Sequence, residues 1–233
     1  MLDSKTEVIL ALDVESRAKA EKILVATGAK LKWVKIGLQT YLRDGPNFLH
    51  EIASSGKEIF LDLKLHDIPN TMVKAIESLS DLPIKMLTLH STAGPEALEK
   101  CAIAAKQFLP NTKLLAVTVL TSMNQNNLSS IGVENKIPDQ VDKLAQMAIN
   151  SNIDGIVCSP LELIRLKPIL PGSTTFVTPG IRPEGSATGD QKRVMTPYQA
   201  AQAGANFLVI GRPIIAANNP ETALTEIQAE IDR

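Results

Sequence analysis

The stretch IFLDLKLHD (59–67) holds the pattern that decides the fold of this chain. A short, nearly continuous apolar run ends in charged residues, and a helical pattern follows it. Apolar runs of this length are typical of parallel strands that are buried on both faces. The same unit recurs along the chain, with apolar runs at 8–13, 33–37, 59–64, 87–90, 114–120, 155–159, 175–180 and 207–211.

Helical patterns lie between these eight predicted strands. Two of them show an apolar face, formed by Val141, Leu144, Ala145 and Ala148 in one and by Leu224, Ile227 and Ile231 in the other. Three carry an N-cap residue followed by proline at the first helical position: Ser159–Pro160, Thr196–Pro197 and Asn219–Pro220.

Eight strands that alternate with helices predict a (β/α)8 TIM barrel, an α/β fold, formed as a single domain over residues 1–233. An open doubly wound sheet is the alternative. Its dinucleotide-binding version is disfavoured, because no G-x-G-x-x-G follows the first predicted strand.

Composition narrows the classes of partner. The formal net charge is -1, from 24 basic and 25 acidic residues, and aromatic residues make up 3% of the chain. We therefore expect neither nonspecific nucleic-acid binding nor binding to an acidic membrane. The isolated Cys101 and Cys158, in apolar surroundings, are typical of a reducing cytoplasm. The N-terminus does not resemble a signal peptide, and no apolar run reaches the length of about 20 residues that a membrane helix needs.

In a barrel of this kind, the chemistry takes place at the C-terminal ends of the strands. Asp62 and Lys64 are two residues apart, so strand alternation points both into the barrel mouth and the neighbouring leucines toward the helices. Lys35, at the end of the adjacent strand, can supply the counter-charge to Asp62. Asp67 lies beyond the strand, where alternation does not predict its direction. A structural ion-pair network at the rim is the alternative to a catalytic centre.

The three histidines do not form a metal-binding pattern. His50 is expected at the surface and His66 in a packing or hydrogen-bonding role. His90 ends a predicted strand, and its role stays open at this point.

The last two predicted strands end in TPGIR (178–182) and VIGRP (209–213). Gly180 and Gly211 let backbone N–H groups approach an anion, and Arg182 and Arg212 add guanidinium donors. Phosphate sites in barrels often form after strands 7 and 8, so we expect a phosphate here. Ordinary turn glycines beside surface arginines are the alternative. The polar stretch PEGSATGDQKR (183–193), which includes Gln191, has the composition of a lid.

The run DLKLHDIPNT (62–71) resembles the signature of the orotidine 5′-phosphate decarboxylase family. The resemblance continues, in the family's order and over nearly the whole chain, through ALD (11–13), VKIG (34–37), VTVLTS (117–122), CSP (158–160), TPGIR (178–182), GDQKR (189–193) and VIGRPI (209–214). It implies cofactor-free, metal-free conversion of orotidine 5′-phosphate to UMP and CO₂, the last step of de novo pyrimidine biosynthesis, in a cytoplasmic homodimer.

The resemblance also implies roles for individual residues. Lys64 would be the proton donor to C6 of the pyrimidine, within a network of Lys35, Asp62, Lys64 and Asp67. Asp67 and Thr71 would reach into the partner subunit's site. The remaining substrate-binding residues would be Asp13 and Lys35 at the ribose hydroxyls, Thr121 and Ser122 by the ribose and base, Gln191 between base and phosphate, and Arg182, Gly211 and Arg212 at the 5′-phosphate.

Two other functions remain open from the sequence. One is a related sugar-phosphate decarboxylase or aldolase, which shares an Asp-x-Lys-x-x-Asp pattern but uses Mg²⁺ and an enediolate. The other is a non-catalytic barrel that binds a nucleotide phosphate. The latter would keep the arginine turns but would not need Lys64 among paired aspartates.

Overall fold

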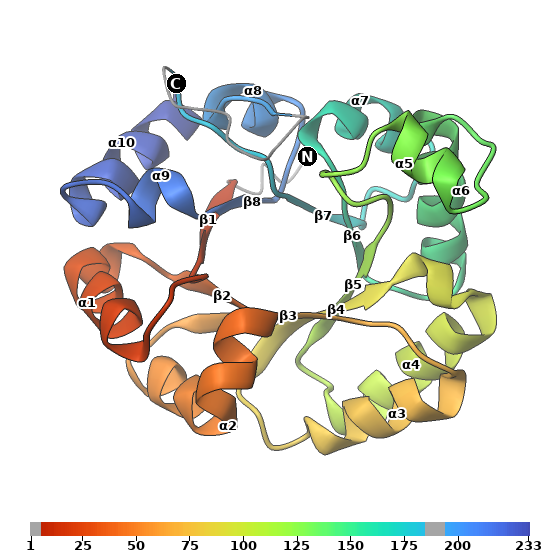
Figure 1. The fold of residues 1–233 in the computed structure, drawn as a ribbon, viewed down its shortest axis with the longest axis horizontal. Coiled ribbons are helices and arrows are strands. Elements are labelled where there is room, and N and C mark those ends of the chain that lie inside the picture. Colours follow the sequence, from red (N-terminus) through yellow and green to blue (C-terminus); the bar gives the residue numbers. More distant parts are fainter. Residues whose placement is uncertain (1–5, 185–193) are drawn as a thin grey trace.

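The computed structural model describes residues 6–184 and 194–233, and its eight parallel strands close into a barrel in chain order. The strands form the central ring and the helices surround it, with β1 beside β8 (Figure 1). The strands are β1 (Glu7–Ala11), β2 (Trp33–Gly37), β3 (Glu58–Leu65), β4 (Ile84–His90), β5 (Lys113–Val117), β6 (Gly155–Val157), β7 (Thr175–Thr178) and β8 (Phe207–Ile210). The predicted (β/α)8 barrel is confirmed, and the open sheet is excluded.

The helices follow the strands in the order expected of a barrel. They are α1 (Arg17–Thr27), α2 (Leu38–Ser54), α3 (Pro69–Ser78), α4 (Pro95–Phe108), α5 (Gln125–Ser130), α6 (Ile137–Asn150), α7 (Leu163–Leu166), α8 (Pro197–Gln202), α9 (Arg212–Ile215) and α10 (Pro220–Ile231), with single 3₁₀ turns at η1 (Gly28–Lys30), η2 (Ser91–Ala93) and η3 (Pro160–Glu162).

The predicted N-caps are confirmed. The side chains of Ser159, Thr196 and Asn219 each accept a backbone N–H from the first turn that follows them. The turn after Ser159 is 3₁₀ rather than α-helical, and α7 continues from it. The cap forms either way, since it needs only a hydroxyl and the nearby N–H groups.

Apolar side chains fill two separate layers. Inside the barrel lie Ile9, Ala11, Trp33, Phe60, Met86, Leu115, Val177 and Val209. A larger layer lies between strands and helices, and it includes Leu10, Val34 and Leu61 as well as the buried faces predicted for α6 and α10. Strand alternation therefore sends neighbouring residues to opposite layers. The inner layer closes the barrel below its mouth and separates the polar side chains at the mouth from those at the base, where Lys113 donates to Thr175.

Strand β3 departs from regular geometry where its charges begin. Its pairing with β4 shifts register between Leu61 and Leu65, and Lys64 has φ +50. Leu61 is fully buried and Leu63 and Leu65 pack on the outer layer, as alternation predicts. The break in the ladder at Lys64 was not predicted from the sequence.

No helix in the two described segments has the length and apolar character needed to cross a membrane.

Candidate active site

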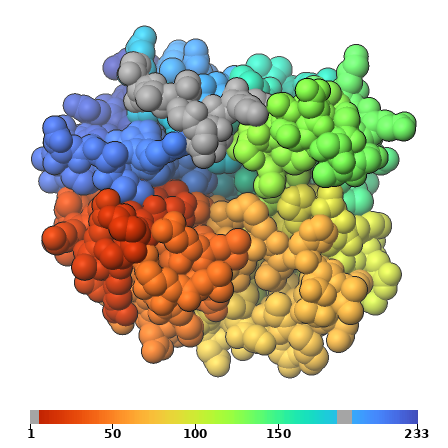
Figure 2. Space-filling view, viewed as in Figure 1, coloured from red at the N-terminus to blue at the C-terminus, as the bar shows by residue number. Residues whose placement is uncertain are grey.

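A cavity of about 530 Å³ opens at the C-terminal ends of the strands. Eight of the residues predicted for the site line it: Asp13, Lys35, Asp62, Lys64, Thr121, Arg182, Gly211 and Arg212. These come from six of the eight strand ends, so the barrel brings together side chains as distant in sequence as Asp13 and Arg212. Figure 2 shows that segments from the red to the blue part of the chain follow one another around this view of the molecule.

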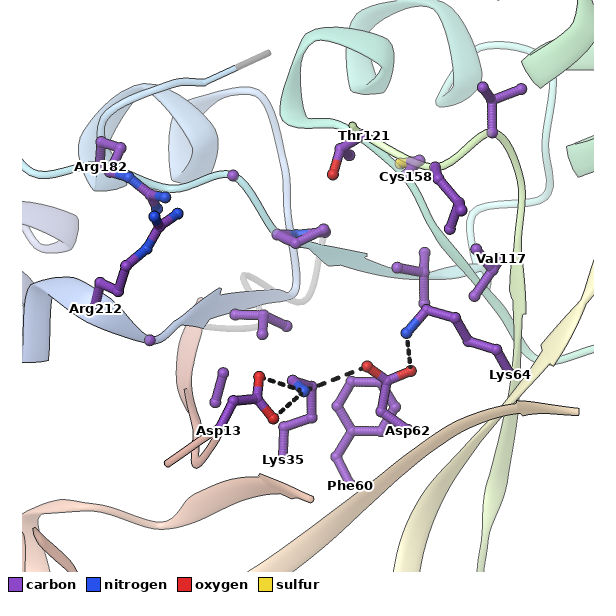
Figure 3. Close-up of a pocket in the computed structure, with 18 of the residues that line it drawn as sticks. Asp13, Lys35, Phe60, Asp62, Lys64, Val117, Thr121, Cys158, Arg182 and Arg212 are labelled. Carbon is purple, nitrogen blue, oxygen red and sulfur yellow. Dashed lines mark hydrogen bonds and ion pairs between the residues drawn. The ribbon is translucent and has the colours of Figure 1, made fainter. Parts of the chain in front are cut away.

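One side of the cavity carries alternating charges (Figure 3). Lys35 Nζ lies 3.0 Å from Asp13 Oδ2 and 3.4 Å from Asp62 Oδ2, and Lys64 Nζ lies 2.8 Å from Asp62 Oδ1. The expected pairing of Asp62 with Lys35 and Lys64 is therefore present. Asp13 extends the sequence of charges at the opposite end from Lys64.

Asp62 is ionised in this setting. Burial is the largest single influence on its carboxyl and favours the neutral form. The positive charges of Lys35 and Lys64, with hydrogen bonds from Lys64 and Thr88, outweigh it and hold the pKa of Asp62 below its ordinary value. A buried, ionised carboxylate between two ammonium groups is typical of a functional centre, and also of a structural ion-pair network.

Gly37 makes room for this group of charges. A Cβ atom at this position would lie 2.9 Å from Asp13 Oδ1 and 2.9 Å from Lys35 Nζ, which is too close for either atom. Gly37 also pairs with Asp62 in the β2–β3 register. Sequence reasoning treated VKIG only as a strand and a motif. The glycine at the end of this strand was the available signal that other side chains approach the backbone closely.

The opposite side of the cavity carries the two arginines. Figure 3 shows the guanidinium groups of Arg182 and Arg212 turned toward one another, across the cavity from the carboxylates. Arg182 is buried, and its Nη1 donates to the carbonyl of Ile181 at 2.8 Å. Gly180, which precedes Ile181 and Arg182, has φ +81, a conformation that favours glycine. Two convergent guanidinium groups suit a ligand group with two negative charges.

An apolar wall separates the two charged ends, and the sequence did not predict it. It includes Val117, Val119, Leu120, Val157 and Ile215, with Phe60 at the floor. Apolar surroundings lower the local dielectric, so charges that develop beside them interact more strongly than in water. The cavity can therefore hold an apolar or flat group between its line of alternating charges and an arginine end that suits an anion.

Three predicted site residues lie outside the cavity. Asp67, Thr71 and Ser122 are exposed and do not line it. Asp67 Oδ1 accepts the backbone N–H of Ile68 at 2.7 Å, in the turn before α3. Gln191 lies outside the described residues, as does most of the predicted lid.

The structure confirms the surface position expected for His50 and shows a packing contact for His66. His50 is exposed on α2, and His66 stacks on His90 with ring centroids 5.3 Å apart. Burial, followed by the charges of His66 and Lys64, lowers the pKa of His90 from 6.5 to about 4. Across residues 6–184 and 194–233, no three His, Cys, Asp or Glu side chains gather in a way that could hold a metal ion.

Comparison with known proteins identifies the family. The model of the orotidine 5′-phosphate decarboxylase / HUMPS family matches residues 6–227. An orotidine 5′-phosphate decarboxylase of Opitutus terrae is 48% identical over 225 residues, covering 97% of this chain and 98% of its own. The enzyme of the same name from Idiomarina loihiensis is 40% identical, with 97% of each chain covered.

A solved structure agrees with these relatives. The crystal structure of orotidine 5′-phosphate decarboxylase from Lactobacillus acidophilus superposes with a TM-score of 0.84 at 33% identity, covering 98% of this chain and all of the other. The chain therefore belongs to the orotidine 5′-phosphate decarboxylase / HUMPS family.

Proposed function

We propose that this cavity converts orotidine 5′-phosphate to UMP and CO₂ without a cofactor, the last step of UMP biosynthesis. The observation that carries the proposal is the line Asp13–Lys35–Asp62–Lys64 at one end of a cavity whose other end holds two converging arginines. Membership of the family, and relatives of this name along nearly the whole chain, support it.

The substrate has matching chemistry along its length. Its phosphate would bind Arg182, Arg212 and the backbone of Gly211, and its ribose hydroxyls would meet Asp13 and Lys35. Thr121 and Ser122 would lie by the ribose and base, and Gln191 would link base and phosphate. This orientation would place the pyrimidine carboxylate near Asp62 and its C6 near Lys64.

The chemical step breaks the bond between C6 and the carboxyl carbon. The electron pair remains on C6, CO₂ leaves, and Lys64 Nζ delivers a proton to C6. The ammonium group of Lys64 stabilises the negative charge as it develops, and afterwards Lys64 regains its proton from solvent. In the structure this ammonium group is already held 2.8 Å from Asp62, so little reorganisation is needed.

Magnitudes favour stabilisation of the transition state over repulsion in the ground state. Two like charges about 4 Å apart repel by about 4 kcal/mol at an effective dielectric near 20. Enzymes commonly lower barriers by about 8–23 kcal/mol. Lys35 and Lys64 also partly neutralise Asp62, which weakens its repulsion of a carboxylate. Phosphate binding at a remote point supplies free energy that holds the reacting groups in place.

The same proposal includes a homodimer with shared sites, located in the cytoplasm. Asp67 and Thr71 do not face the cavity of their own chain, which is consistent with a role in the partner's. Beside them on the surface are Ile68, 66% exposed before α3, and Ile103, 69% exposed on α4. Exposed apolar side chains at the start of α3 and on α4, two helices that pack together, suit a subunit interface. Cys101 and Cys158 are both buried and form no disulfide, which suits a reducing compartment.

Loss of orotidine 5′-phosphate absorbance with purified protein tests the activity directly. Turnover that survives EDTA supports the proposal. Loss of turnover on chelation, with rescue by Mg²⁺, would favour the metal-dependent class of this superfamily. Tight binding of UMP with no turnover would indicate a non-catalytic nucleotide-binding barrel.

Mixing two inactive variants tests the shared sites. One protein carries Lys64→Ala and the other carries Asp67→Ala. When the two are dissociated and reassociated together, each heterodimer has one site with both residues intact and one site with both substituted. About a quarter of the wild-type activity is expected at equal mixing, because half of the dimers are mixed. No recovery in a confirmed heterodimer would exclude sharing through Asp67.

A further inference from the structure

Thr88 lies between the two charged residues of β3, although it belongs to β4. Its side chain is fully buried, with 0% of the residue exposed. Its Oγ1 lies 2.9 Å from Asp62 Oδ1 and 2.8 Å from the backbone nitrogen of Lys64. One hydroxyl thus contacts both a carboxylate of the charge line and the backbone of the proposed proton donor.

The direction of these two hydrogen bonds is determined by chemistry. An ionised carboxylate only accepts, so the Thr88 hydroxyl donates its proton to Asp62. A backbone N–H only donates, so the oxygen of the same hydroxyl accepts from Lys64. Thr88 therefore uses its donor and one lone pair at once, in a place closed to water.

The backbone of Lys64 gives this contact its importance. Lys64 has φ +50, a region that residues with a side chain seldom adopt and that often marks functional sites. The β3–β4 pairing shifts register between Leu61 and Leu65. The N–H of Lys64 is bonded to the Thr88 hydroxyl at that shift, so a side chain supports the unusual conformation.

We propose that Thr88 is a positioning residue for decarboxylation: its hydroxyl joins the Asp62 carboxylate to the left-handed backbone of Lys64 and so aims the ammonium group at C6. The inference rests on the proposed function and adds a residue to it. Thr88 does not touch the substrate. It acts by holding the Asp62 oxygen that also accepts from Lys64 Nζ, at 2.8 Å.

Thr88→Val tests this role, because valine keeps the shape of threonine and lacks the hydroxyl. We expect kcat to fall by roughly 10²-fold while KM changes by less than about threefold, since the phosphate and ribose contacts remain. Thr88→Ser restores the hydroxyl and should recover most of kcat. The acid limb of the pH profile should move to higher pH in Thr88→Val, because Asp62 loses a donor.

Thr27→Val is the matched control. Thr27 is also a buried threonine, and its hydroxyl donates to the carbonyl of Ile23 at 2.8 Å in α1, away from the cavity. It should lose stability without the change in kcat or in the pH profile. If Thr88→Val does not fold, Thr88→Ala carries the same test, since it lacks the hydroxyl and has a smaller side chain.

Binding of 6-hydroxyuridine 5′-phosphate, whose ring anion resembles the C6 carbanion, separates the two proposals. The wild-type protein should bind it far more tightly than UMP, and Thr88→Val should lose much of that preference. If the wild type shows neither turnover nor this preference, the proposed function is wrong and the positioning role falls with it. If the wild type shows both turnover and this preference, and folded Thr88→Val equals it in both, then Thr88 has only a packing role.

Discussion

Two buried lysines occupy opposite ends of this barrel and have different partners. Lys35, at the mouth, is 8% exposed, and Lys57, just before β3 at the base, is 9% exposed. Lys35 contacts the carboxylates of Asp13 and Asp62, whereas Lys57 donates to the backbone carbonyls of Gly28 and Leu31. Burial alone therefore does not distinguish a lysine of the proposed active site from one at the base of the barrel.

The two lysines differ in the groups that they contact. At the base, Lys57 joins two segments that lead into the neighbouring strand β2, and burial lowers the pKa of its ammonium group. At the mouth, Lys35 is one of a line of charges that borders an open cavity. Carboxylates and ammonium groups there can exchange partners with a ligand, while backbone carbonyls at the base have no such alternative. This is the division between reactive and stabilising ends that barrel enzymes share.

The strongest test of this comparison is Lys64→Ala at the mouth. We expect decarboxylation to fall by roughly 10³-fold or more, because proton donation and electrostatic stabilisation of C6 are lost together. The protein should lose some stability but stay folded, because Asp62 loses one partner and keeps Lys35 and Thr88. Single-turnover kinetics and denaturant unfolding measure the two effects. Substantial retained turnover would remove Lys64 from the role of proton donor.

Arg212→Ala should have the next largest effect, on substrate affinity. A lost charge-assisted hydrogen bond to phosphate is worth about 1.5–3 kcal/mol, so KM should rise by roughly 10–150-fold. In the wild-type protein, inorganic phosphite should partly rescue the turnover of a substrate that lacks the phosphate group. In Arg212→Ala, this rescue should be weaker. An unchanged KM would exclude this turn as the phosphate site.

Lys57→Met should show the reverse pattern at the base. Two carbonyls would lose their donor, so the protein should lose about 1–3 kcal/mol of stability while kcat and KM stay within about twofold. Denaturant unfolding and steady-state kinetics check both. Lys143→Met, which changes an exposed lysine on α6, is the matched control and should alter neither. A large loss of kcat in a folded Lys57→Met protein would break the comparison.

The smallest expected effect concerns the pH dependence of stability at His90. Its folded pKa of about 4 lies below the ordinary value of 6.5, so the unfolded chain takes up this proton first as the pH falls. The contribution to stability is complete above about pH 6.5 and is lost progressively toward pH 4. His90→Gln should flatten the fall in unfolding free energy across that range. His50→Gln, at an exposed site on α2, should leave it unchanged, and equal slopes for all three proteins would contradict the assignment.

Much of the fold could be predicted because it depends on local patterns. The eight apolar runs correspond to the eight strands, although the runs at 8–13 and 114–120 extend past the strand ends at Ala11 and Val117. Of these extra residues, Leu12 packs in the layer between strands and helices, whereas Val119 and Leu120 line the cavity. The N-caps and the apolar faces of α6 and α10 were also correct, since each depends on neighbours within one or two turns.

The candidate site was predictable only in part. Alternation correctly paired Asp62 with Lys64, and the strand order correctly supplied Lys35. Thr88 was missed because a threonine inside a strand is ordinary until a carboxylate is known to face it from the next strand. Gly37 was missed for a similar reason, since the atoms it makes room for come from Asp13 and Lys35. Asp67 and Thr71 stay predictions, because their proposed contacts lie in a second chain.

By itself, then, the sequence determined which segments become strands and helices, which charges stand at strand ends, and which family the chain resembles. Only the tertiary structure decided that Lys35 lies between Asp13 and Asp62, and that Thr88 supports Lys64 in its left-handed conformation. The physical reason is the separation along the chain of the residues that interact. Periodicity and capping act between residues a few positions apart, whereas ion pairs and steric fit depend on distances that exist only once the barrel has closed.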